Sequence, residues 1–168
     1  LEFESGFTET HSAAIVFRRT TVPTTEGPYI IRGAFGAATR PVITFSHNGV
    51  GFQTTSAVVC LIFSDFDLEN TNATKTASYG FNLGNYGSNA VEIHRCRIKS
   101  STNKFYRGIH GGFNNVVVRE CEIAYCANSG LFGVDANSSR SLILDNYIHH
   151  NGNHGIDGTT GSETIWYI

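Results

Sequence analysis

The stretch VVVRECEI at residues 116–123, followed by Gly130 and Leu131, decides the fold because the chain repeats its pattern. Three other segments alternate apolar and polar residues in the same way: LIFSDFDL at 61–68, VEIHRCRI at 91–98 and SLILDNYI at 141–148. Their last residues lie 30, 25 and 25 positions apart, at Leu68, Ile98, Ile123 and Ile148. A short apolar strand recurring at this period is typical of a solenoid, in which each repeat forms one coil.

Each repeated strand is followed by a glycine and a large apolar residue: Gly80-Phe81, Gly108-Ile109, Gly130-Leu131 and Gly155-Ile156. Because alternate residues of a strand face the same side, the repeats predict three inward columns. These columns are Phe63, Ile93, Val118 and Ile143; Leu68, Ile98, Ile123 and Ile148; and Phe81, Ile109, Leu131 and Ile156. The glycines are expected at a bend, where either a side chain would be awkward or φ is positive.

The composition suits short strands joined by tight turns within one domain. The chain has 168 residues, of which 40% are hydrophobic and 15% charged, with 18 Gly and only 3 Pro. The formal net charge of −2 and the lack of a Lys/Arg run argue against nucleic-acid binding and against an anionic membrane as partner. No stretch of 18 apolar residues is present, so the sequence predicts no membrane span.

The repeats predict two parts, an N-terminal lead-in or cap segment over 1–28 and a parallel β-helix over 29–168. Residues 13–18 are expected to form a first strand, and 29–32 and 42–45 two more, joined by a turn over 33–41. The apolar segment IWYI at 165–168 falls at the start of a further coil, so the C-terminal coil is expected to be incomplete. Met is absent, even at position 1, so we expect a processed chain, an excised domain or a partial sequence.

The repeats resemble the right-handed parallel β-helix of the broad pectate-lyase-like group. Residues 27–44, GPYIIRGAFGAATRPVIT, are similar to a stretch that opens the helix in many secreted β-helix proteins acting on polysaccharides. The resemblance covers about residues 27–168 and implies an all-β solenoid with an extracellular or cell-surface location. It does not fix an activity, because this architecture hosts lyases, hydrolases, epimerases, tailspikes, adhesins and spacers.

Stacking the repeats also aligns charged residues, in the columns Asp65, Arg95, Glu120 and Asp145, and Asp67, Arg97, Glu122 and Tyr147. Opposite charges then lie one coil apart, either as a charged cleft or as a ladder of ion pairs that fixes the register between coils. We expect the ladder, in which each exposed pair is worth about 0–1 kcal/mol.

A third column contains Phe66, Cys96, Cys121 and Asn146. Two stacked cysteines would have Cα atoms about 5 Å apart, within disulfide range, although small residues also stack at such turns without a bond. Cys126 is expected to be a free, partly buried thiol, and Cys60 has no evident partner.

The candidate site lies around the Gly-apolar strand. Its outward column is Asn82, His110, Phe132 and Asp157, and the residues before each glycine are Tyr79, Arg107, Ser129 and His154. The residues that we expect to carry chemistry are Arg107, His110, Asp135, His154 and Asp157. A lyase or epimerase withdraws a proton beside a carboxylate while a cation or metal stabilises the charge, and a hydrolase needs paired carboxylates. Asp135, Asp157 and a His would also suit a divalent metal such as calcium. The alternative to a functional site is that these residues form an ordinary polar face of the solenoid and that Asp157 is simply part of a turn.

Two functions follow from these patterns. In the first, the protein acts on or binds an extended extracellular polysaccharide, as a lyase, epimerase or hydrolase. The stretch HHNGNHGI at 149–156 is similar to turns of epimerase-like and carbohydrate-binding β-helix repeats, whereas the polygalacturonase, pectate-lyase and alginate-epimerase signatures are missing. In the second, it is a non-catalytic structural or adhesive module of a fibre, surface protein or tailspike that assembles through the strand at 165–168.

Overall fold

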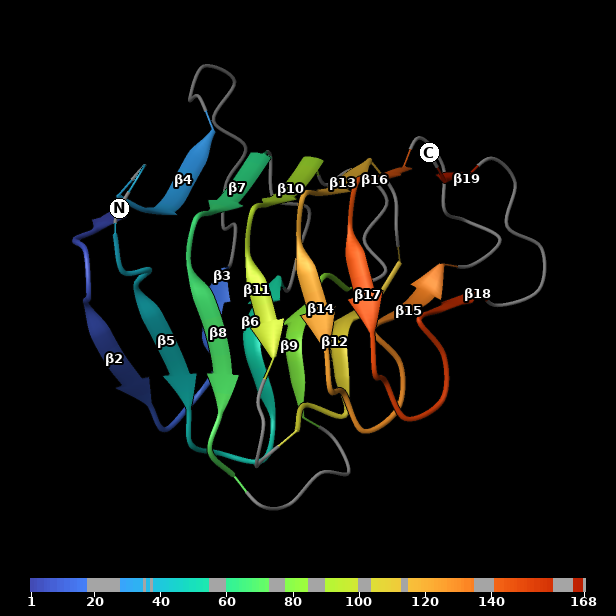
Figure 1. Cartoon of the computed structure of the whole chain (residues 1–168), viewed down its shortest axis with the longest axis horizontal. Helices are drawn as coiled ribbons and strands as arrows, with labels where there is room; N and C mark the ends of the chain where they lie inside the picture. Colours follow the sequence, from blue (N-terminus) through green and yellow to red (C-terminus); the bar gives the residue numbers. More distant parts are fainter. Residues whose placement is uncertain are drawn as a thin grey trace.

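The computed structural model is a stack of coils built from three parallel β-sheets (Figure 1). It describes residues 1–17, 28–34, 36, 38–54, 60–72, 78–84, 90–99, 104–112, 115–134, 141–158 and 165–167. Successive strands pass from sheet A to sheet B to sheet C and back to sheet A, one coil further along the stack. The predicted all-β parallel β-helix is therefore confirmed.

Each sheet takes every third strand of the chain. Sheet A contains β1 (Glu2–Phe3), β4 (Tyr29–Gly33), β7 (Cys60–Ser64), β10 (Ala90–His94), β13 (Val116–Arg119), β16 (Ser141–Leu144) and β19 (Ile165–Tyr167). Sheet B contains β2 (Thr8–His11), β5 (Val42–Phe45), β8 (Asp67–Asn70), β11 (Arg97–Lys99), β14 (Glu122–Ala124) and β17 (Tyr147–His149). Sheet C contains β3 (Ile15–Phe17), β6 (Val50–Thr54), β9 (Tyr79–Asn82), β12 (Arg107–His110), β15 (Leu131–Val134) and β18 (Ile156–Gly158).

The register between coils is the one that the repeats predict. Ile98 pairs with Leu68 on one side and with Ile123 on the other. In sheet C, Phe132 pairs with His110 and with Asp157. Strand β19 pairs with β16 and so extends sheet A, as expected for the segment at 165–168. No helix among these residues is long and apolar enough to cross a membrane.

Strand pairing begins nearer the N-terminus than the repeats predict. β1, β2 and β3 pair in parallel with β4, β5 and β6, so residues 1–17 already contribute to all three sheets. Residues 18–27 lie outside the described part, and the division at residue 28 stays a prediction. Strand β6 was also missed, although Gly51-Phe52 within it is the same Gly-apolar pair that marks the later repeats.

The predicted inward columns form the core. All of their members are buried except Ile148 and Ile156, which are half-buried and pack against the core. Phe52 widens the aromatic part, since its ring centroid lies 5.1 Å from Phe63 and 5.2 Å from Phe81. Burial of this apolar stack is the main force that holds the coils together, because each coil covers the core residues of the next.

The backbone bends in two different ways between the sheets of each coil. The two-residue turn between sheets A and B has positive φ at Asp65, Arg95, Glu120 and Asp145. The glycines before sheet C do not have positive φ; a side chain there would clash with the next coil. A Cβ added to Gly108 would lie 2.7 Å from Cγ2 of Ile123 and 2.8 Å from the carbonyl oxygen of Gly130.

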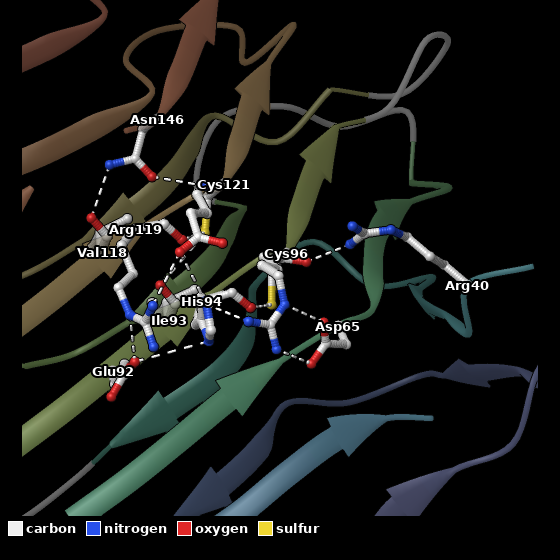
Figure 2. A network of polar contacts seen from close by, with 12 residues as sticks. Arg40, Asp65, Glu92, Ile93, His94, Cys96, Val118, Arg119, Cys121 and Asn146 are labelled. Carbon is white, nitrogen blue, oxygen red and sulfur yellow. Dashed lines mark hydrogen bonds and ion pairs between the residues drawn. The ribbon is translucent and has the colours of Figure 1, made fainter. Parts of the chain in front are cut away.

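Ion pairs join neighbouring coils along the turn between sheets A and B (Figure 2). Arg95 binds Asp65 through two hydrogen bonds of 2.6 and 2.9 Å, and Arg97 binds Asp67 in the same way. The ladder is thus observed at the Asp/Arg steps. At the Arg/Glu steps the recorded ion pairs differ from the prediction, because Glu120 pairs with Arg119 and His94, and Glu122 with Lys99 and His149.

The cysteines are free thiols, and the column of Cys96 and Cys121 lies inside the solenoid. Burial raises the pKa of Cys121 to about 11 and that of Cys126 to about 12, so these thiols are protonated and unreactive at neutral pH. Cys126 is fully buried rather than partly buried as predicted. Asn146 closes the column, since its side chain accepts from the backbone N–H of Cys121 and donates to the carbonyl oxygen of Val118 (Figure 2).

Candidate functional site

The outer face of sheet C is the part of the solenoid with the longest flanking connections. Only two residues separate β10 from β11, whereas residues 100–106 precede β12 and residues 111–115 follow it. Connections on the surface tolerate variation and carry binding residues more often than the strands do. The connections on either side of sheet C can therefore place further side chains beside those of its strands.

Arg107 and His110 begin and end strand β12, and both side chains lie on this outer face. Nη1 of Arg107 donates to Nδ1 of His110 over 3.0 Å. The guanidinium also lies flat on the neighbouring coil, with Cζ 3.2 Å from the ring centroid of Phe132. This contact is a cation–π interaction, which holds the arginine against the sheet.

The His110 ring is the middle layer of an aromatic stack across three coils. Its centroid lies 4.4 Å from that of Tyr79 and 5.3 Å from that of Phe132, with interplanar angles of 26° and 23°. Burial, and then the charge of Arg107, lower the pKa of His110 from 6.5 to about 4. The ring is thus neutral at pH 7. Because arginine only donates, Nδ1 carries no proton and Nε2–H is left as a donor.

Arg107 carries a charge that no carboxylate of the described residues balances. Several other cations of the solenoid are paired with a carboxylate, for example Arg32 with Glu2 and Lys99 with Glu122. Within the described ranges, Nε of Arg107 is buried and has no hydrogen-bond partner. A half-buried guanidinium with no carboxylate partner among the described residues favours an anionic ligand at its exposed atoms, above all a planar carboxylate.

Asp157 lies further along the same column, on the far side of Phe132 from His110. Oδ2 of Asp157 is 3.3 Å from the hydroxyl of Ser129, a buried residue whose hydroxyl also lies 2.8 Å from Oδ1 of Asn128. The amide of Asn128 in turn donates to the phenol of Tyr106 over 2.7 Å. A polar row thus runs beside the aromatic stack.

The structure brings together only some of the predicted site residues. Arg107 and His110 are in contact, and Asp157 lies two strands away in register. His154 is exposed, and its recorded contact is a backbone one, the carbonyl accepting from N–H of Gly130. Asp135 lies outside the described residues.

A calcium site gains no support from the described part of the chain. There, no group of three or more His, Cys, Asp or Glu side chains is arranged to hold a metal ion. His110 and Asp157 are separated by the ring of Phe132, and the hydrogen bond from Arg107 occupies Nδ1 of His110. His110 and Asp157 are therefore not placed to coordinate one metal ion together.

The aromatic members of the site were not predicted. Tyr79 and Phe132 had been placed in the outward columns but were not chosen as site residues, and Tyr106 and Asn128 were not singled out. One signal in the sequence could have identified them. Aromatic residues stand at outward positions of neighbouring repeats, where packing of the core does not require a large ring.

A family model for the right-handed β-helix region matches residues 31–165. The chain belongs to the right-handed β-helix family. The match covers most of the solenoid, including strands β6, β9, β12, β15 and β18 of sheet C. No curated protein and no solved structure matches this β-helix chain.

On this face of the β-helix, the chemistry favours ligand binding over proton transfer. A general base needs a free lone pair near its ligand, but Nδ1 of His110 is occupied by Arg107. The His110 Nε2–H, the Asp157 carboxylate and the Arg107 guanidinium are instead suited to hydroxyl and carboxylate groups. The stacked rings cover one another's faces and so offer their edges as an apolar border beside these polar groups.

Proposed function

We propose that this β-helix protein binds an extended acidic polysaccharide along the outer face of sheet C. The observation that carries the proposal is Arg107, a half-buried guanidinium held against Phe132 with donors that no described carboxylate uses. A uronate carboxylate is the polysaccharide group that would satisfy it. The neighbouring rings of Tyr79, His110 and Phe132 would support the sugar rings of the chain.

The repeating geometry supports a polymer rather than a small ligand. His110, Phe132 and Asp157 come from successive coils and lie in register, so their spacing follows the parallel strands, about 4.8 Å per coil. A linear polysaccharide lying across the strands would meet one of these side chains in each coil. An extended face of this kind would recognise a chain through repeated modest contacts.

The test is binding of polygalacturonate and alginate by isothermal titration calorimetry, with wild type and variants compared on the same polymer. Arg107→Gln is expected to weaken binding of the acidic polymers about tenfold, which corresponds to about 1.4 kcal/mol. Arg32→Gln is the matched control, because Arg32 is exposed on sheet A and already paired with Glu2. Equal affinities of wild type and R107Q, or no binding of either acidic polymer, would refute the proposal.

The same incubations distinguish binding from turnover. Release of unsaturated ends or shortening of the polymer by the wild type would assign a reaction to this face. Absence of both binding and turnover would leave the non-catalytic structural module as the better interpretation of the fold.

A further inference from the structure

A second cluster of aromatic and histidine side chains lies on the outer face of sheet B, away from Arg107 and His110. It consists of Tyr125, Tyr147, His149 and His150, and we name it the sheet B platform. Tyr147 is 64% exposed and Tyr125 36% exposed, among the largest apolar exposures in the described residues. Tyr147 and His149 lie on β17, whereas Tyr125 directly follows β14 and His150 directly follows β17.

The rings form two stacks that touch each other. The Tyr147 and His149 ring centroids are 4.0 Å apart at 27°, and those of Tyr125 and His150 are 5.3 Å apart at 22°. His149 joins the stacks by an edge contact with Tyr125 at 5.7 Å. The result is a continuous aromatic surface whose rim carries phenol and imidazole groups.

Two of these residues adopt a backbone conformation that side chains normally avoid. Tyr125 has φ 58° and His150 has φ 53°, at equivalent positions of successive coils. The left-handed conformation costs free energy for residues with a Cβ, and Asn or Gly would fill it more easily. The same conformation recurs in the turns between sheets A and B, so it is a feature of the solenoid's turns that places Tyr125 and His150 at matching positions of adjacent coils.

Hydrogen bonds fix which atom of the platform faces a ligand. Nε2 of His149 lies 3.4 Å from Oε1 of Glu122, so this nitrogen is the donor. In the tautomer of His149 that carries its proton on Nε2, Nδ1 accepts from Nδ1 of His150, 2.6 Å away. His150 therefore keeps its proton on Nδ1, and its Nε2 is left as an acceptor at the exposed edge.

The charges around the sheet B platform indicate which kind of ligand it can bind. Glu122 is already neutralised by Lys99, whose Nζ lies 2.8 and 2.9 Å from the two carboxylate oxygens. An anionic sugar would find no unpaired cation here among the described residues and would face Glu122. A neutral sugar ring fits, because its C–H face stacks on the tyrosines while a hydroxyl donates to Nε2 of His150.

We infer that the sheet B platform is a second carbohydrate-binding site, and that it takes a neutral sugar unit. It is independent of the acidic-polymer site on sheet C, so the two proposals succeed or fail separately. The protein would then hold two kinds of sugar residue on two faces of one solenoid.

Affinity electrophoresis of the full chain in gels that contain hydroxyethyl cellulose, galactomannan or dextran tests this inference. At least one neutral polymer is expected to retard the wild type. Tyr147→Ala and His150→Asn are each expected to weaken that binding at least fivefold, corresponding to about 1 kcal/mol. Asn suits the left-handed backbone at position 150, so H150N removes the ring without harming the fold.

Tyr29→Ala is the matched control, since Tyr29 is an exposed tyrosine on sheet A. Tyr147→Phe keeps the ring and is expected to retain most of the binding, whereas R107Q should leave it unchanged. The inference is overturned if no neutral polymer retards the wild type, or if Y147A and H150N bind as well as wild type. It also fails if R107Q abolishes retardation by neutral polymers, because that result would place their binding on sheet C.

Discussion

At the scale of single residues, His110 shows how packing changes the chemistry of a side chain. A free imidazole near neutral pH is a proton shuttle. Between Tyr79 and Phe132, and beside the charge of Arg107, the same ring has a pKa of about 4. It therefore serves as a neutral donor held in place by the rings on both of its faces, which suits recognition of a ligand.

The lowered pKa of His110 predicts how stability depends on pH. The unfolded chain has an ordinary histidine with a pKa of about 6.5, so between about pH 6.5 and 4 it binds more protons than the folded chain. The contribution of His110 to stability is thus fully present above about pH 6.5 and is lost as the pH falls to about 4. His110→Gln is expected to flatten this part of the decline in urea midpoints measured from pH 7.5 to 4.5.

His154→Gln is the control for that measurement, because His154 is exposed and makes no recorded ring contact among the described residues. Its pH profile should follow the wild type. Only the slope is compared, since H110Q also removes the stacking contacts and lowers stability at every pH. Parallel profiles of wild type and H110Q would contradict the prediction.

At the scale of strands and turns, the glycines before sheet C allow the coils to approach closely. Gly51, Gly80, Gly108 and Gly130 each lie where an added Cβ would come within 2.6–2.8 Å of another atom, and in each case a carbonyl oxygen of the next coil is near. Gly155 in the same column differs, since its nearest neighbour would be Cγ2 of Ile148 at 3.5 Å.

This difference predicts unequal effects of one substitution at two equivalent positions. Gly108→Ala is expected to destabilise the protein by about 1–3 kcal/mol, because Ile123 and the backbone of the next coil must move. Gly155→Ala meets only an ordinary contact and should stay within about 0.5 kcal/mol of the wild type. Urea denaturation of both variants measures this, and equal losses would show that the close approach is not the cause.

The strands with strict alternation were predicted from the sequence. In the first coil only the strand over 13–18 was predicted, and β3 (Ile15–Phe17) confirms it, whereas β1 and β2 were missed. Strand β2 (TETH) contains no apolar residue, and Ala14 stands where the later coils have glycine, so the repeat is hard to see there. The positive φ angles at Asp65 and Arg95 were also missed. Asp tolerates that conformation, whereas Arg has no preference for it, and the stacking of the coils imposes it at both positions.

At the scale of the whole molecule, the period of the repeats was enough to place distant residues on one face. It aligned His110, Phe132 and Asp157, which the strand register confirms. It did not indicate that Arg107 turns onto Phe132, or that Ser129 reaches Asp157, because side-chain rotamers depend on neighbours in other coils. The sequence therefore located the face, and the structure was needed to see which side chains meet on it.

The axis of the solenoid sets the direction in which a bound polymer runs. Tyr79, His110, Phe132 and Asp157 belong to four successive coils, so the face is about 14 Å long at about 4.8 Å per coil. The contacts are distributed along this length and are each modest. A short oligomer would satisfy Arg107 but would leave part of the face uncovered.

Affinity for galacturonate oligomers is therefore expected to rise with chain length and to level off once the ligand reaches from Tyr79 to Asp157. R107Q should lower the affinity at every length, because the carboxylate contact is common to all the complexes. Titration calorimetry with purified oligomers of increasing length measures both effects. Affinity that is independent of length would mean that ligand contacts are confined to the neighbourhood of Arg107, and the lengthwise path along the coils would then be wrong.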